Sequence, residues 1–176
     1  MGRDDIITAR HNVLDRINKE LNEDKIAAVF QASEDGAPET VSVLFDEMGE
    51  EGEGEAAGQI FFRPFTSSED KVQYFAAILT PWEDIPKDRL PALYEAISYV
   101  NFTLPAGCFT VDKDHSFCTF ILSAPLPIDL PEEELLDRAE TVLGSAVATA
   151  DAFFDILTDV VDGKKTVKDV VAFLEE

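Results

Sequence analysis

The side chains that could do chemistry are few or poorly spaced in this sequence. His11 and His115 lie far apart along the chain, and neither has a second ligand at a spacing typical of zinc sites. No serine stands in a nucleophile-elbow sequence, and no dinucleotide-binding glycine pattern follows an apolar run. Carboxylates are abundant, but acid–base catalysis needs a cleft that shifts their pKa, and the sequence reveals none. We therefore predict no catalytic, metal-binding or cofactor-binding residues, and no enzymatic activity.

The two cysteines lie in two short runs rich in β-branched and aromatic residues, 107–112 and 117–124, which a polar loop separates. This pattern predicts a β-hairpin. With four residues in the loop, Val111 faces Cys118. Cys108 then lies on the opposite side of the sheet, because side chains alternate along a strand. A disulfide is therefore disfavoured, and we expect both cysteines to behave as small hydrophobic side chains.

The chain is strongly acidic, with 36 Asp and Glu against 14 Lys and Arg and a formal net charge of −22. Such a chain repels phosphate backbones and anionic lipid, so neither nucleic acid nor a membrane surface is an expected partner. The first ten residues carry charges where a secretory signal needs an apolar core, and no stretch is long and apolar enough to span a bilayer. We expect a cytoplasmic protein.

Helical periodicity appears in three places. Apolar residues recur at three- and four-residue intervals over 4–22, over 90–104 and over 130–161, and a short helix is predicted over 166–175. Pro105 ends the middle helix, and Gly107 permits a sharp change of direction before the hairpin. The last long helix has a wide apolar face.

Strand patterns occupy most of the remaining first half of the chain. The runs 25–32, 40–45 and 59–65 read as strands. The run 71–80 fits both a strand and a helix, and we predict a strand there. The segment 46–58 is too acidic and glycine-rich to pack, so we predict a flexible acidic loop there. It lacks the residue order of a calcium-binding loop. With 45% hydrophobic residues among 176, the chain is expected to form a single domain over 1–176.

One stretch resembles a known family. An amphipathic helix ending in an asparagine, a Pro-x-Gly-x-Phe strand, a hairpin and a long C-terminal helix are similar to the YbjN-like family, named as bacterial sensory-transduction regulators. The resemblance covers about the last two thirds of the chain, from the Phe61 region onward. It implies the α+β fold of type III secretion chaperones, an antiparallel β-sheet flanked by helices in the order α-β-β-β-β-α-β-β-α, commonly dimeric and with a strand at 71–80. The matching residues are Leu93, Ile97, Asn101, Pro105, Gly107 and Phe109.

Strand alternation then predicts an apolar face on the sheet. We take Arg63 and Gln73 to mark the side that faces away from the helices. Such a face is too apolar for a monomer's open surface, so it is covered either by a helix of the same chain or by a second copy or partner polypeptide. The predicted partner-binding residues on this side are Leu44, Phe61, Phe65, Phe75, Leu79 and Ile121.

Two functions remain open. The first is a non-enzymatic protein-binding module, chaperone-like or regulatory, that acts as a homodimer. The second is a regulator that senses a small ligand in a pocket between sheet and helices, with Trp82, Tyr94 and Tyr99 in its walls. Asn101 carries no chemistry in either case, because an asparagine at a helix end usually satisfies backbone groups.

Overall fold

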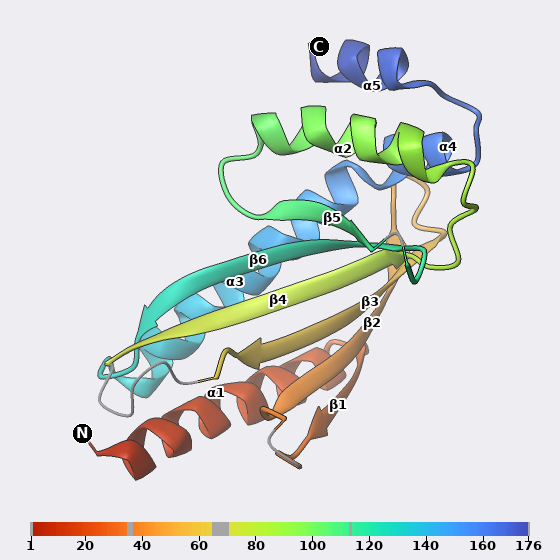
Figure 1. Cartoon of the computed structure of the whole chain (residues 1–176). Coiled ribbons are helices and arrows are strands. Elements are labelled where there is room, and N and C mark those ends of the chain that lie inside the picture. Colours follow the sequence, from red (N-terminus) through yellow and green to blue (C-terminus); the bar gives the residue numbers. More distant parts are fainter. Residues whose placement is uncertain (1, 35–36, 65–70, 113, 176) are drawn as a thin grey trace. The chain divides into compact units, whose positions relative to one another are not determined.

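The computed structural model describes residues 2–34, 37–64, 71–112 and 114–175, whose course is drawn in Figure 1. The predicted α+β class and element order are confirmed, with the predicted long helix divided into α3 and α4 and the predicted short terminal helix present as α5. In chain order the elements are α1 (Arg3–Glu23), β1 (Ala27–Gln31), β2 (Thr40–Met48), β3 (Gly54–Phe62), β4 (Val72–Trp82), α2 (Leu90–Thr103), β5 (Cys108–Asp112), β6 (Phe117–Pro127), α3 (Glu132–Ala152), α4 (Phe154–Val161) and α5 (Val167–Leu174).

The strands within the described ranges form one antiparallel sheet in the order β1-β2-β3-β4-β6-β5, so β1 and β5 are its edge strands. The ambiguous segment 71–80 belongs to strand β4, as the family resemblance required. The predicted hairpin register is confirmed, because Val111 pairs with Cys118. Cys108 pairs with Ile121 instead, and both cysteines are free.

The described residues fall into two compact units. Unit 1 contains Met1–Phe45, Ala57–Ile78 and Ser123–Ser145. Its core lies on one side of the strands, where Phe62 and Phe75 meet edge to face at 5.3 Å. The Arg10 guanidinium of α1 lies over the Phe62 ring, 5.1 Å from its centroid, so α1 covers this side. The buried helix residues of unit 1 include Ile6, Val13, Leu14 and Ile17 from α1 and Leu135, Leu136, Ala139 and Leu143 from α3.

Unit 2 contains Asp46–Ala56, Leu79–Leu122 and Ala146–Glu176. Its core is aromatic: Trp82 stacks on Phe154 at 5.7 Å, and Phe109 contacts Phe120 at 4.9 Å. The Trp82 indole N–H donates to Thr158 Oγ1 at 2.9 Å, which satisfies its one donor. Helix α2 lies along β5 and packs on α4 and α5 (Figure 1).

The segment 46–58 is not the flexible loop that its composition predicted. Strand β2 continues to Met48 and strand β3 begins at Gly54, so only a short turn separates them. Met48 and Ala56 are buried. A Cβ placed on Gly54 would lie 2.3 Å from the Phe154 ring, so glycine at this position allows close packing.

Backbone contacts hold this turn in place. The Gly49 N–H donates to Asp151 Oδ1 and the Glu50 N–H to Asp155 Oδ2, each at 2.7 Å. Gly49 has a φ of 83°, a left-handed conformation that glycine adopts without steric cost. The acidic, glycine-rich composition therefore encodes a tight turn against the end of α3 and the start of α4.

The predicted long helix over 130–161 is also interrupted. Helix α3 ends at Ala152 and α4 begins at Phe154, with a bend of 48° between them. The break directs Phe153 towards Phe109 and Phe173, each at 6.1 Å, while Phe154 stacks on Trp82. Within the described parts of the chain, no single helix is long and apolar enough to cross a membrane, and α3 and α4 reach that length and composition only as a bent pair.

Candidate functional site

The helix-free side of the unit 1 strands exposes apolar side chains. Inward positions such as Val41, Val43 and Ile60 are buried, and the positions between them point the other way. Large hydrophobic side chains at these outward positions remain accessible, and we call this cluster the apolar face. It consists of Val29 (62% exposed), Leu44 (39%), Val72 (45%), Tyr74 (50%) and the half-buried Phe61.

The predicted partner-binding residues are divided between the two sides of the sheet. Leu44 and Phe61 lie on the apolar face. Phe75 and Leu79 do not: both are completely buried, and Phe75 packs on Phe62 beneath α1. The error came from Gln73, which is only 4% exposed and lies on the covered side with them.

Phe65 and Ile121 are the other two predicted partner-binding residues. Phe65 lies outside the described residues. Ile121 is half-buried in unit 2, opposite Cys108 and on the other side of β6 from the buried Phe120. Val29, Val72 and Tyr74 were missed by sequence reasoning, although the alternation of β4 contained the signal for two of them. The use of any of these residues by a partner stays a prediction.

The outward side of the unit 1 strands carries no acidic residue at the described positions. Since 36 of the 176 residues are Asp or Glu, this is a marked local depletion. Arg63 lies at the rim and donates from Nε to Ser123 Oγ at 3.2 Å. The outward positions are Ala27, Val29, Gln31, Thr40, Ser42, Leu44, Ala57, Gln59, Phe61, Val72, Tyr74, Ala76, Ile78, Ser123, Pro125 and Pro127.

Each edge strand is held by an asparagine of the preceding helix. In unit 1, Asn22 Nδ2 donates to the Ala28 carbonyl at 2.9 Å, and the Ala28 N–H reaches Asn22 Oδ1 at 3.5 Å. In unit 2, Asn101 makes the same pair of bonds with Phe109, at 2.9 and 2.7 Å. The expected backbone role of Asn101 is confirmed. Tyr94 adds a hydrogen bond from its hydroxyl to the Val111 carbonyl at 2.8 Å.

A cavity of about 340 Å³ lies beside α1 in unit 1. Arg10 lines it and donates from Nη2 to the carbonyls of Phe62 and Arg63, at 2.6 and 2.9 Å. Burial lowers the Arg10 pKa, and nearby Glu39 opposes that shift. No sequence motif pointed to this cavity. Its other lining residues are Arg3, Ile7, Leu14, Ser33, Ala37, Pro38 and Pro64.

The three aromatic residues predicted to line a pocket have different environments. Trp82 is buried against Phe154, whereas Tyr94 and Tyr99 are about half exposed. The Tyr94 hydroxyl is engaged by the Val111 carbonyl. The cavity beside α1 is therefore a better place to look for a small ligand than the neighbourhood of these residues.

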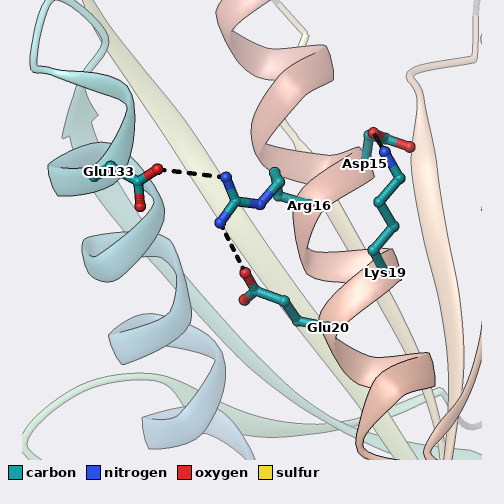
Figure 2. Close-up of polar contacts among 5 residues, drawn as sticks. All are labelled: Asp15, Arg16, Lys19, Glu20 and Glu133. Carbon is teal, nitrogen blue, oxygen red and sulfur yellow. Dashed lines mark hydrogen bonds and ion pairs between the residues drawn. The ribbon is translucent and has the colours of Figure 1, made fainter.

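Helices α1 and α3 meet through a charged cluster, shown in part in Figure 2. Arg16 bonds Glu20 Oε1 at 3.1 Å and Glu133 Oε1 at 3.4 Å. Glu20 also shares a hydrogen bond with Glu140, which raises the pKa of Glu140 to about 7, with burial as the second cause. The same bond lowers the pKa of Glu20. Two adjacent carboxyl groups of this kind hold one proton between them near neutral pH.

The histidine and cysteine side chains that could take part in chemistry have different local environments. His11 Nδ1 lies 3.0 Å from Glu39 Oε1, and His115 Nδ1 lies 2.9 Å from Asp112 Oδ2. The hydrogen bond that the His115 ring donates to the Asp112 carboxylate raises the pKa of His115. Burial raises the pKa of Cys118 to about 12, so this thiol is a poor nucleophile. Among the described residues, no group of three or more His, Cys, Asp or Glu could hold a metal ion.

Comparison with known proteins gives similarity of fold alone. No family model and no curated protein matches the chain. An uncharacterized protein from Methanothermobacter thermautotrophicus is similar in structure, with 16% identity over 78% of this chain and 93% of that chain and a TM-score of 0.42. YbjN, a proposed transcription regulator from E. coli, is similar with 13% identity over 79% of this chain and 91% of its own, at a TM-score of 0.37. YbjN is the protein whose family the sequence resembles.

Proposed function

We propose that this protein is a non-enzymatic, cytoplasmic protein-binding module, chaperone-like or regulatory, that acts as a homodimer through its apolar face. The observation that carries the proposal is the exposure of Val29, Leu44, Val72 and Tyr74 on one helix-free side of the strands in unit 1. Burying one such side chain stabilises a complex by about 1.5–3 kcal/mol before the cost of association. The secretion-chaperone-like fold and the bacterial origin that the resemblance implies belong to the same proposal.

A second copy is the partner that the charge distribution favours. Two chains of net charge −22 repel each other, so a homodimer needs a contact surface from which carboxylates are absent. The described outward positions of the unit 1 strands carry no carboxylate and so meet this condition. A twofold axis places the same patch of one copy against that of the other, so a neutral, apolar patch is self-complementary.

Sedimentation measurements on the full chain test this proposal. We expect the wild-type protein to sediment as a dimer at about 100 µM and Tyr74→Glu to sediment as a monomer, because the twofold axis would bury two new carboxylates. Phe102→Glu is the matched control, since Phe102 is 92% exposed on α2 and lies off the apolar face. A monomeric wild type, or dissociation caused by Phe102→Glu alone, would contradict the proposal.

The cavity beside α1 supports a second candidate function, the sensing of a small ligand. Its walls combine apolar side chains such as Ile7 and Leu14 with Arg10 and Glu39, so a small molecule with an apolar part and opposite charges fits it. Free amino acids are suitable probes. We expect a fitting amino acid to raise the melting temperature of the wild type and not that of Leu14→Trp, which fills the cavity.

A further inference from the structure

We propose that the outer edge of β1 binds an extended polypeptide segment that carries lysine or arginine, as an added strand. The inference rests on the proposed function only in taking the partner to be a polypeptide. It concerns the strand edge and its backbone groups, not the apolar face.

The outer edge of β1 is only partly closed. In the β1–β2 ladder Ala28 pairs with Val43 and Phe30 with Val41. Because the Ala28 peptide groups bond Asn22, they point away from β2, and those of Phe30 point the same way. Among the described residues, no hydrogen bond reaches the Phe30 N–H or carbonyl. An edge with free peptide groups is a template for a further strand.

The other edge of the sheet shows what closure looks like. On β5 the outward N–H and carbonyl of Phe109 bond Asn101, and the outward carbonyl of Val111 bonds Tyr94. Helix α2 thus supplies two side chains to one edge. Among the hydrogen bonds between described residues, Asn22 is the one side chain of α1 that bonds the edge of β1, so β1 is the more open edge.

A buried side-chain oxygen near β1 also lacks a partner among the described residues. Asn18 Oδ1 is buried and accepts no hydrogen bond among the described residues. Asn18 lies between His11 and Asn22 on the side of α1 that faces β1, because His11 contacts Phe30 and Asn22 contacts Ala28. Asn18 Oδ1 is thus an unused acceptor next to a strand whose outer peptide groups are also unused. Both observations favour a further binding partner at this edge.

Two hollows lie next to the C-terminal end of β1, one on each side of the sheet. One is the cavity beside α1, on the helix side, and the other is lined by Gln31, Ala32, Thr40 and Gln59. The two share Ala37 and Pro38. Side chains of an added strand alternate between the two faces, so successive residues can enter the two hollows in turn. This arrangement suits an extended segment better than a helix.

Charge selects the kind of segment. Glu34 and Glu39 border the open end of β1, and the whole chain carries a net charge of −22. A second copy added at this edge would bring its own carboxylates to those of the first. A segment with lysine or arginine between apolar residues is attracted instead, in contrast to the carboxylate-free apolar face.

Amide hydrogen exchange with synthetic peptides tests the inference on the full chain. The probe is a capped octapeptide of alternating lysine and valine, and its matched control replaces lysine with glutamate. We expect saturating lysine peptide to slow exchange of the Phe30 amide at least tenfold and to leave the Phe109 amide unchanged. The glutamate peptide should leave the exchange of both amides unchanged. Equal protection by both peptides, or none at Phe30, would overturn the inference.

A proline variant checks that the backbone makes the contact. Ala32→Pro removes the next N–H on the outer edge, and proline is tolerated at edge positions whose N–H faces solvent. We expect Ala32→Pro to weaken peptide binding at least tenfold and Ala32→Ser, which keeps the N–H, to bind normally. Unchanged binding by Ala32→Pro would overturn the inference. If the protein sediments as a dimer but the lysine peptide does not protect the Phe30 amide, the proposed function stands and this inference fails. If the protein is a monomer and the peptide does protect that amide, only this inference stands.

Discussion

The two edge strands carry the same asparagine contact and differ in what else reaches them. In β1 and in β5 the contacted residue is the second of five, Ala28 or Phe109, and the asparagine comes from the end of the helix just before. On β5 Tyr94 continues the row, whereas nothing described continues it on β1. One asparagine side chain therefore positions the start of an edge strand. A second side chain is needed to bond the remaining outward peptide groups.

Removing the asparagine from the closed edge should have the largest effect. Asn101→Ala leaves the Phe109 N–H and carbonyl without partners beside α2, where Asn101 itself is half-buried. We expect a loss of about 2 kcal/mol in the free energy of unfolding, measured by urea denaturation. Asn101→Asp keeps an acceptor for the N–H and should lose less. Equal stability of Asn101→Ala and wild type would show that the Asn101 contact does not stabilise the closed edge.

The same change at the open edge should cost less. In Asn22→Ala the longer of the two lost bonds measures 3.5 Å, and Asn22 is exposed, so water can replace it. We expect a loss of about 1 kcal/mol or less, together with faster hydrogen exchange of the Ala28 amide. A loss as large as that of Asn101→Ala would show that both contacts are equally buried in solution.

The smallest effect concerns the carboxyl pair formed by Glu20 of α1, the helix that contacts β1, and Glu140 of α3. Because the pKa of Glu140 is raised from 4.5 to about 7, the folded chain binds this proton more tightly than the unfolded chain. The free energy of unfolding therefore falls as the pH rises from about 4.5 to about 7. The lowered pKa of Glu20 acts in the opposite direction below pH 4.5. Besides Glu20, the charges that face Glu140 are Asp137 and Arg16.

Glu140→Gln separates this pair from the other titrating groups. We expect the urea midpoint of the variant to fall less between pH 5 and pH 8 than that of the wild type. The difference should be modest, because Glu140 is partly exposed and solvent screens the pair. Parallel pH profiles for the two proteins would show that the two carboxyl groups do not share a proton.

Features set by short-range chemistry were predictable from the sequence. The polar loop of the hairpin placed Val111 opposite Cys118, because a loop of known length determines strand register. The backbone role of Asn101 followed from its place at a helix end. Helix and strand order followed from periodicity, with the family resemblance deciding the ambiguous segment that became β4.

Features set by long-range packing were not predictable. Gln73 was taken as a marker of the open side, but its amide bonds the Val72 carbonyl, and it lies buried on the same side as Phe75. A buried polar residue that forms hydrogen bonds inside the fold has the same residue type as an exposed one. Residue type alone therefore does not show which side of a strand is buried. The residues of the apolar face were therefore only partly identified. The cavity beside α1 left no local signal, because its walls come from distant parts of the chain.

The turn between β2 and β3 has a practical consequence. From composition, 49–53 looks like the natural place for a protease to cut or for a fusion tag to be inserted. The Gly49 and Glu50 amides are tied to Asp151 and Asp155, and Gly54 sits against Phe154. Cleavage or insertion there would disrupt the contacts of the turn with α3 and α4. A fusion tag should therefore be placed elsewhere.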